Sequence, residues 1–208
     1  VRALLDLYRD RGVAADRCLV HAFTDGRDTP PNSALGFVSE LARYMERVGF
    51  GRVATVCGRY FAMDRDQRWD RVEQAWRCLV RGVGERAPSA EQAVRDAYAR
   101  GETDEFIKPT VVGAPDAGRI ADGDAVVFFN FRADRARELT LALMDPMFTG
   151  FAIDGPRPRL YFATMTRYRS DFPQLGIVDA FAPQSFVNLL ADVVARAGRN
   201  QLRIAETE

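Results

Sequence analysis

The chain has 208 residues, of which 47% are hydrophobic, enough to bury the core of one domain. Its 29 basic and 29 acidic residues cancel, so no overall field would draw it to nucleic acid or to an anionic membrane. Three cysteines without C-x-x-C spacing exclude a disulfide framework, and no apolar stretch of about 18 residues or charged leader is present. These features predict a cytoplasmic protein that contacts no membrane.

The predicted elements alternate between helix and strand along the chain. In chain order, they are a helix at 2–12, a strand at Arg17–Phe23, a helix at 34–48, a strand at Arg52–Cys57 and helices at 67–82 and 89–100. After an irregular stretch at Glu105–Val112 come a strand at Asp124–Phe129, a helix to about 144, a strand at Arg159–Met165, a helix at 184–197 and a last strand at Gln201–Ile204. This order predicts an α/β fold with one open, mostly parallel sheet flanked by helices in three layers.

Two local features support this order. Ser33 stands where it can cap the helix at 34–48, because a serine hydroxyl can accept a hydrogen bond from an unpaired backbone N–H group there. The stretch Asp124–Phe129 is continuously apolar after its first residue, which is typical of a strand with helices over both faces. We therefore expect helices to cover both faces of this strand.

Three of the predicted strands are followed by loops that are rich in arginine and aspartate. The arginines and the aspartate singled out in these loops are Arg27 and Asp28 after the first strand, Arg59 and Arg65 after the second, and Arg132 and Arg135 after the third. In a parallel sheet such loops share one edge, which is where ligands of open α/β folds bind. An anion would relieve the repulsion between converging guanidinium groups, so this edge predicts a phosphate or carboxylate site.

Arg132 and Arg135 are three residues apart at the expected start of a helix, where exposed N–H groups and the helix dipole also favour anions. The alternative interpretation is that each arginine only pairs with a nearby aspartate and staples its own loop. For three loops at one edge this alternative is weaker, although for any single loop the two interpretations are about equal.

Other sites are poorly supported. His21 is the only histidine and lies at the end of a strand, where we expect a hydrogen-bonded structural group rather than a catalytic base. One histidine and no thiolate cluster argue against zinc, whereas an all-carboxylate magnesium site stays open. The chain has neither a G-x-S-x-G elbow nor a glycine-rich phosphate loop, so it lacks a recognisable nucleophile or nucleotide cradle.

The same loops carry a family resemblance. The segments His21–Pro31 (HAFTDGRDTPP), Gly58–Val72 (GRYFAMDRDQRWDRV) and Asn130–Arg135 (NFRADR) are similar to signature blocks of 2,3-bisphosphoglycerate-independent phosphoglycerate mutases. Further stretches at 98–106 and 202–208 fit the same family, so the resemblance covers nearly the whole chain. The resemblance implies a two-domain enzyme that interconverts 3-phosphoglycerate and 2-phosphoglycerate in glycolysis and gluconeogenesis.

In that family, one domain resembles alkaline phosphatases and holds two Mn²⁺ ions and a serine that is transiently phosphorylated. The other domain is inserted into it and holds the phosphoglycerate. The resemblance implies that residues 1–208 are the inserted domain alone, without metal ligands or nucleophile, and that both chain ends are cut. On its own, such a segment should have no mutase turnover.

The family's substrate-contacting positions match Arg27, Asp28, Arg59, Arg65, Arg132 and Arg135. The arginines would hold carboxylate and phosphoryl oxygens, and Asp28 would bind the glycerate hydroxyls and move a proton. A histidine and a lysine that contact substrate in the family lie just outside this chain, so His21 should not inherit the histidine's role. Partners implied are the phosphoglycerates and the metal-binding domain of the same polypeptide, with the protein a monomer.

Two other functions compete with this one. A stand-alone module that binds sugar phosphates or small anions without chemistry remains an alternative. Flanking segments with metal ligands and a serine nucleophile would distinguish the two. A nucleic-acid binder is disfavoured, because the chain is neutral and its arginines are interleaved with acids.

Overall fold

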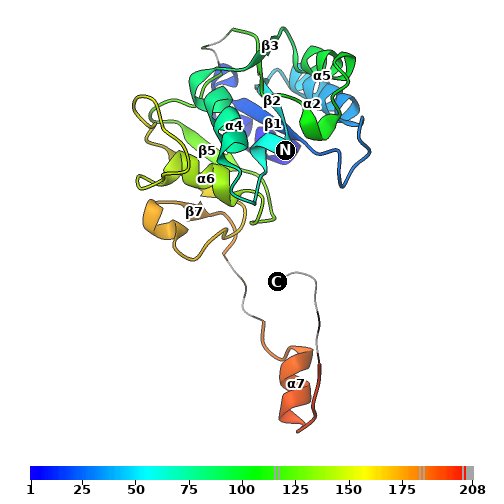
Figure 1. Cartoon of the computed structure of the whole chain (residues 1–208), viewed down its shortest axis with the longest axis vertical. Coiled ribbons are helices and arrows are strands. Elements are labelled where there is room, and N and C mark those ends of the chain that lie inside the picture. Colours follow the sequence, from blue (N-terminus) through cyan, green and yellow to red (C-terminus); the bar gives the residue numbers. More distant parts are fainter. Residues whose placement is uncertain (115, 117, 183, 185, 203, 205–208) are drawn as a thin grey trace.

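The computed structural model describes residues 1–114, 116, 118–182, 184, 186–202 and 204. The strands are β1 (Leu19–Thr24), β2 (Arg52–Gly58), β3 (Glu85–Ala87), β4 (Thr110–Val112), β5 (Ala125–Phe128), β6 (Tyr161–Thr164) and β7 (Val178–Asp179). The α-helices are α1 (Arg2–Asp10), α2 (Ala34–Val48), α3 (Arg59–Ala62), α4 (Trp69–Arg81), α5 (Ala90–Ala99), α6 (Arg137–Met144) and α7 (Leu190–Arg196). Short 3₁₀ helices are η1 (Ala15–Arg17), η2 (Asp104–Phe106) and η3 (Phe172–Leu175). Helices and strands alternate along most of the chain, as Figure 1 shows.

Hydrogen bonds join the strands into two sheets. The larger has the order β1-β2-β4-β3, with β1 parallel to β2 and β4 antiparallel to β2. The smaller has the order β5-β6-β7 and is parallel throughout. The rings of Phe23 on β1 and Phe128 on β5 meet edge to face with centroids 6.0 Å apart, so side-chain packing joins the two sheets. The predicted α/β class with parallel-rich sheets is confirmed, although the strands form two hydrogen-bonded sheets rather than one. The expectation that helices cover both faces of β5 was wrong, because Ala125 and Val127 on this strand are exposed.

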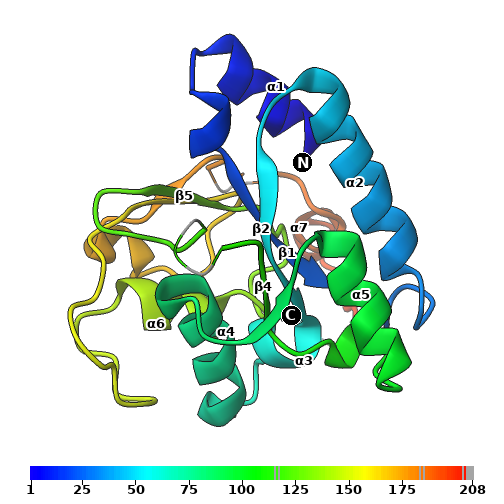
Figure 2. The same ribbon diagram turned by 90° about the horizontal axis from the view of Figure 1, so that it is seen from above.

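Helices cover both faces of the larger sheet, and each face has its own core. On one side α1, α2 and α5 pack through Leu5, Val38 and Val94. On the other side α4 and α6 pack around the fully buried Trp76 and Leu139. Figure 2 shows the two helix groups on opposite sides of β2. Packing in these two cores fixes the positions of the strand ends from which the arginine loops emerge.

Asp104 links distant parts of this fold. Its buried carboxylate accepts hydrogen bonds from the backbone N–H groups of Ser33 and Ala34, both at 2.8 Å, and from the Tyr98 hydroxyl at 2.5 Å. Ser33 is the N-cap residue of α2, but its side chain makes no capping bond. The expected serine cap was therefore wrong in its chemistry, because a carboxylate from η2 satisfies the helix N-terminus instead.

Several element boundaries differ from expectation. The stretch at Glu105–Val112 contains the short strand β4, and β3 and β7 were not expected at all. Strands of two or three residues leave no periodicity that a sequence pattern can show. The helix expected at 184–197 is confined to α7, and the described residues of the last expected strand, 201, 202 and 204, are not in a strand. Residue 203 of that expected strand lies outside the described residues.

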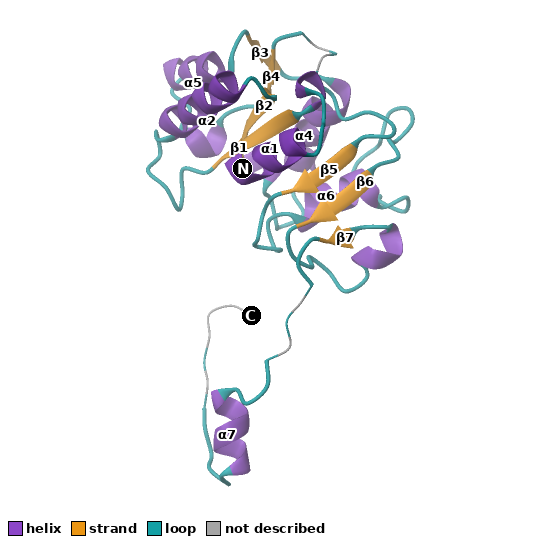
Figure 3. Cartoon of the chain, turned by 180° about the vertical axis from the view of Figure 1, so that it is seen from behind, coloured by secondary structure: helices purple, strands orange, loops and turns teal. Residues whose placement is uncertain are grey.

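The last helix stands apart from the sheets. Figure 3 shows α7 well away from the layered body. Its side chains are largely exposed, including Leu190 at 75% and Val193 at 48%. None of the helices in the described part of the chain is long and apolar enough to cross a membrane.

Candidate anion site at the strand ends

Arg59 is the centre of the first half of the site. We call Asp25, Arg27, Asp28 and Arg59 the Arg59 cluster. The Nη1 atom of Arg59 donates to Asp25 Oδ1 at 2.5 Å and to Asp28 Oδ2 at 3.1 Å, while the side chain itself is only 6% exposed. Burial alone would lower the pKa of Arg59, but hydrogen bonds to both aspartates outweigh it and raise that pKa. The arginine after β2 is thus locked to the loop after β1.

Two glycines let the chain close around this cluster. A Cβ atom on Gly58 would lie 2.3 Å from the backbone oxygen of Glu105, and one on Gly26 would lie 2.8 Å from the backbone nitrogen of that residue. Gly26 also has a φ of +73°, which favours glycine. The Thr24 hydroxyl donates to the Asp104 carbonyl at 2.6 Å, so η2 supports both strand ends. Glu105 then reaches Arg27, whose Nε lies 3.4 Å from its carboxylate.

The second half of the site gathers around one carboxylate. We call Arg65, Arg132, Asp134 and Arg135 the Asp134 cluster. Asp134 Oδ2 accepts from Arg65 Nη1 at 2.9 Å and from Arg132 Nη2 at 3.4 Å. Arg135 instead donates through Nη1 to the Met63 carbonyl at 3.2 Å. Two arginines therefore share one acidic side chain and the third has none, which leaves this cluster with excess positive charge.

The two clusters lie close enough for their charges to interact. Burial is the first cause that lowers the pKa of Arg135, and the charges of Arg59, Arg65 and Arg27 lower it further. Arg135 therefore interacts electrostatically with three of the other predicted residues. Asp28 is connected to them through its ion pair with Arg59. Arg132 joins them through Asp134. The structure thus brings all six predicted residues to one region, where their mutual repulsion favours a bound anion.

Two buried donors in this region have no protein partner. The Nε atoms of Arg59 and Arg135 are buried and meet no hydrogen-bond acceptor among the described residues. A buried N–H group without an acceptor is costly, by about 1–3 kcal/mol. Both orphan donors belong to arginines that were predicted to hold an anion, and an oxyanion is an acceptor that would satisfy them.

The expectation of a helix start at Arg132 and Arg135 was wrong. Helix α6 begins at Arg137, and both arginines lie in the turn before it. The helix dipole therefore gives no argument for an anion at these two side chains. The alternative interpretation of local staples is also only partly right, because Arg59 and Arg65 pair with aspartates of other loops, across 31 to 69 residues of sequence.

His21 has a structural environment. Its Nδ1 atom lies 2.9 Å from the Thr55 hydroxyl on the neighbouring strand. Burial, followed by the charge of Arg52, lowers its pKa from 6.5 to about 4, although Asp124 acts in the opposite direction. The ring is thus neutral at pH 7 and hydrogen-bonded within the sheet, in agreement with the expectation that it is not a catalytic base.

Three acidic partners of the arginines were not predicted as site residues. Asp25, Glu105 and Asp134 each contact a predicted arginine, but their roles depend on pairing across loops. The sequence indicated Asp25, which directly follows the buried end of β1, and Asp134, which lies between Arg132 and Arg135. Glu105 left no such indication, because Arg27 is remote from it in sequence.

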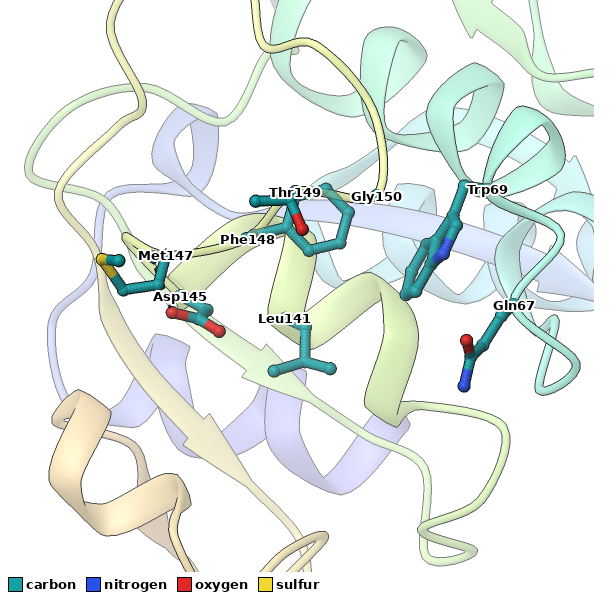
Figure 4. A pocket seen from close by; sticks show the side chains of 8 residues that line it. All are labelled: Gln67, Trp69, Leu141, Asp145, Met147, Phe148, Thr149 and Gly150. Carbon is teal, nitrogen blue, oxygen red and sulfur yellow. Dashed lines mark hydrogen bonds between the residues drawn. The ribbon is translucent and has the colours of Figure 1, made fainter.

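A separate hollow of about 340 Å³ lies between the start of α4 and the end of α6, and Figure 4 shows its lining. Trp69 and Phe148 meet there with ring centroids 5.1 Å apart, and Asp145 is the one acidic side chain in the lining. No arginine lines it among the described residues, so this hollow is a poor match for an anion. Likewise, the described residues contain no group of three His, Cys, Asp or Glu side chains that could hold a metal ion.

Comparison with known proteins agrees with the sequence resemblance. Residues 1–170 match the family described as "BPG-independent PGAM N-terminus". A 2,3-bisphosphoglycerate-independent phosphoglycerate mutase from Syntrophotalea carbinolica is 49% identical over 207 residues, covering 99% of this chain and 39% of that protein. The Myxococcus xanthus protein of the same name is 52% identical over 209 residues, covering 99% and 40%. The chain thus spans about 40% of the length of these curated relatives.

A solved structure supports the same relationship. The crystal structure of Leishmania mexicana phosphoglycerate mutase at low cobalt concentration superposes with a TM-score of 0.80 at 30% identity, over 95% of this chain and 37% of that one. The fold and the clustered arginines define an α/β domain with an arginine-rich rim at its strand ends. The chain belongs to the family of 2,3-bisphosphoglycerate-independent phosphoglycerate mutases and corresponds to their N-terminal part.

Proposed function

We propose that this chain is the substrate-binding and acid–base domain of a phosphoglycerate mutase that interconverts 3-phosphoglycerate and 2-phosphoglycerate. The observation that carries the proposal is the pair of buried Nε donors on Arg59 and Arg135, one in each cluster, that meet no acceptor among the described residues. Phosphoglycerate has a carboxylate and a phosphoryl group, so two neighbouring arginine clusters suit its two anionic ends.

The arginines divide the work by their surroundings. The Asp134 cluster, with three arginines for one aspartate, has charge to spare for the doubly charged phosphoryl group. In the Arg59 cluster, Arg27 is 56% exposed and can turn toward the carboxylate. Transfer of a phosphoryl group needs positioning and charge neutralisation more than covalent work by the protein, and arginines supply both.

Asp28 has the position for proton transfer. Its carboxylate is 70% exposed and held from one side by Arg59 at 3.1 Å, so it faces open space at the site while its backbone is fixed. When the phosphoryl group leaves a glycerate oxygen, the O–P bond breaks and that oxygen takes a proton from Asp28. When the other glycerate hydroxyl attacks, a new O–P bond forms and Asp28 takes the hydroxyl proton back.

The remaining parts of the reaction are assigned to polypeptide outside this chain. We infer that residues 1–208 form the domain inserted into a metal-binding domain, which would supply two Mn²⁺ ions and the serine that carries the phosphoryl group between the two oxygens. Closure of the two domains would exclude water from the transfer. The three cysteines are free and buried, which fits a role in cytoplasmic glycolysis.

A titration of 3-phosphoglycerate into this chain, followed by amide NMR shifts, tests the proposal. We expect shifts at Arg27, Arg59, Arg65 and Arg132, and an affinity reduced at least tenfold in Arg132→Ala. Arg159→Ala is the matched control, because Arg159 is 89% exposed and pairs only with Asp122 on the far end of the smaller sheet. Plain glycerate should bind at least tenfold more weakly.

Equal losses in the Arg132→Ala and Arg159→Ala variants would contradict a specific site. A turnover assay with added Mn²⁺ distinguishes the part from the whole, since the chain alone should not interconvert the two phosphoglycerates. Detectable interconversion by the pure chain would show that the proposed division of labour is wrong.

A further inference from the structure

Two acidic side chains lie next to each other beside the Asp134 cluster, and neither takes part in the proposed reaction. Asp64 and Glu138 are 4% and 6% exposed, and their carboxyl groups lie within hydrogen-bonding reach of each other. Asp64 precedes Arg65 in the loop between α3 and α4, whereas Glu138 lies in the first turn of α6, just after Arg135. The pair therefore joins the two segments that carry the arginines of this cluster.

Each carboxyl group also has its own backbone partners. Asp64 Oδ2 accepts from the N–H groups of Asp66 at 2.9 Å and Arg68 at 3.0 Å. Glu138 Oε1 accepts from the N–H group of Gln67 at 2.8 Å. Its other oxygen, Oε2, is buried and meets no N–H or O–H donor among the described residues. A bond between two carboxyl groups needs one proton, and Oε2 is the oxygen left to carry it.

The surrounding charges favour the proton on Glu138 rather than on Asp64. Arg68 Nη1 lies 3.5 Å and Arg71 Nη1 3.6 Å from Asp64 Oδ1, so the start of α4 stabilises an Asp64 carboxylate. Glu138 faces Asp64 and Asp66 from the loop, and both charges oppose its ionisation. On its own side, Arg135 is engaged with the Met63 carbonyl.

The titration of the pair follows from these contacts. Burial is the main cause that raises the pKa of Glu138 to about 7, with the charges of Asp64 and Asp66 acting in the same direction against the Gln67 hydrogen bond. Burial would also raise the pKa of Asp64, but its hydrogen bonds to Arg68, Asp66 and Glu138 lower it overall. Glu138 is thus the acid of the pair and Asp64 the base.

We propose that Glu138 is a positioning residue whose protonated carboxyl group, bonded to Asp64, holds the Arg65 loop against the turn that carries Arg132 and Arg135. Loss of the shared proton places two carboxylates in contact at a buried site, and their repulsion separates the loop from α6. The Gln67 hydrogen bond and the Asp134 bridge, which cross the same boundary, weaken with it. What the arginines bind rests on the proposed function, whereas the link itself does not.

The test compares the wild-type chain with Glu138→Gln and Glu73→Gln. Glutamine cannot lose the proton, and its amide can donate to Asp64 and accept from Gln67, so Glu138→Gln keeps the link at every pH. Glu73 lies on α4 and pairs with Arg77, which makes Glu73→Gln a matched control outside the link. Both variants should fold like the wild type, since glutamine has nearly the same shape as glutamate.

Amide hydrogen exchange at Gln67 is the first measurement, expressed as protection relative to the intrinsic rate. In the wild type and in Glu73→Gln, we expect protection to fall at least tenfold between pH 6 and pH 9. In Glu138→Gln it should stay constant. Constant protection in the wild type, or the same fall in Glu138→Gln, overturns the proposal. The side-chain carboxyl ¹³C shift of Glu138 should titrate near pH 7, and titration near 4.5 overturns it as well.

Binding of sulfate, whose charge does not change over this range, links the pair to the arginines. The dissociation constant of the wild type should rise at least threefold between pH 6 and pH 8.5, and that of Glu138→Gln should not. A pH-independent constant in the wild type overturns the positioning role. If exchange at Gln67 follows the prediction but sulfate does not bind at all, the link stands and the proposed anion site fails.

Discussion

The two halves of the site are built on opposite principles. In the Arg59 cluster, two aspartates pair with one buried arginine, and a hydrogen bond from Thr24 to Asp104 joins the end of β1 to η2. In the Asp134 cluster, one aspartate holds two exposed arginines, and a third contacts only a backbone carbonyl. The first cluster is nearly neutral and rigid, whereas the second has excess positive charge and is held by fewer contacts.

This difference teaches that the same residue type serves two purposes in one site. Arg59 contributes to the stability of the fold, because its buried side chain joins the start of α3 to the loop after β1 through charged hydrogen bonds. Arg132, at 68% exposure, contributes little to stability and is available to a ligand. Substitutions should therefore separate stability from binding.

The largest effect on stability is expected from a substitution at Gly58, where β2 ends beside the Arg59 cluster. Gly58→Ala places a methyl group 2.3 Å from a backbone oxygen, so the free energy of unfolding should fall by about 3 kcal/mol. Gly36→Ala is the control, because Gly36 is exposed within α2 with no atom near its added Cβ, and it should raise stability by about 0.5–1 kcal/mol. Urea unfolding measures both. Equal stability of Gly58→Ala and the wild type would show that the backbone at the end of β2 shifts to accommodate the methyl group.

Arg59→Met compared with Arg132→Met tests the contrast between the clusters directly. Removing Arg59 leaves Asp25 and Asp28 facing each other and should cost about 2 kcal/mol of unfolding free energy. Arg132→Met should change it by no more than about 0.5 kcal/mol. Thermal and urea unfolding of both variants would refute the contrast if the order were reversed.

The pH dependence of stability distinguishes the groups beneath each cluster. His21 lies on β1 with its pKa lowered to about 4, so its contribution is present above pH 6.5 and lost as the pH falls toward 4. Glu138 has its pKa raised to about 7, so its contribution is present below pH 4.5 and lost as the pH rises toward 7. Between pH 4.5 and 6.5 the two trends oppose each other.

Single variants should reveal each trend. In Glu138→Gln the unfolding free energy should rise with pH over this window, and in His21→Asn it should fall, each by about 1 kcal/mol per pH unit. Since His21 is the only histidine, no other imidazole contributes to the result. Two variants with identical pH profiles would contradict both assignments.

The smallest effect is expected at Asp134. Asp134→Asn removes the charge that Arg65 and Arg132 share, so inorganic phosphate should bind about threefold more tightly at low salt. The cost in stability should be no more than about 1 kcal/mol, because all three side chains are at least 30% exposed. Weaker phosphate binding would mean that Asp134 orients the arginines more than it competes for them.

Much of the fold was predictable because long elements leave periodic patterns. Helices α2 and α4 and strands β2 and β6 lie close to where apolar spacing placed them. The short strands β3, β4 and β7 were missed or left as irregular segments, since they exist only through pairing with a longer neighbour. The same limit explains the start of α6, where the motif of Arg132 and Arg135 forms a turn rather than a helix.

The sequence by itself determined the α/β class, the family and the six charged residues at the strand ends, because each depends on local order along the chain. Tertiary structure alone decided which charges meet: Arg59 with Asp25 and Asp28, Arg65 with Asp134, and Asp64 with Glu138. These pairs join loops that are 31 to 74 residues apart, as for Asp28 with Arg59 and Asp64 with Glu138. Electrostatic pairing depends on distance in space, which only the packing of helices against the sheets sets.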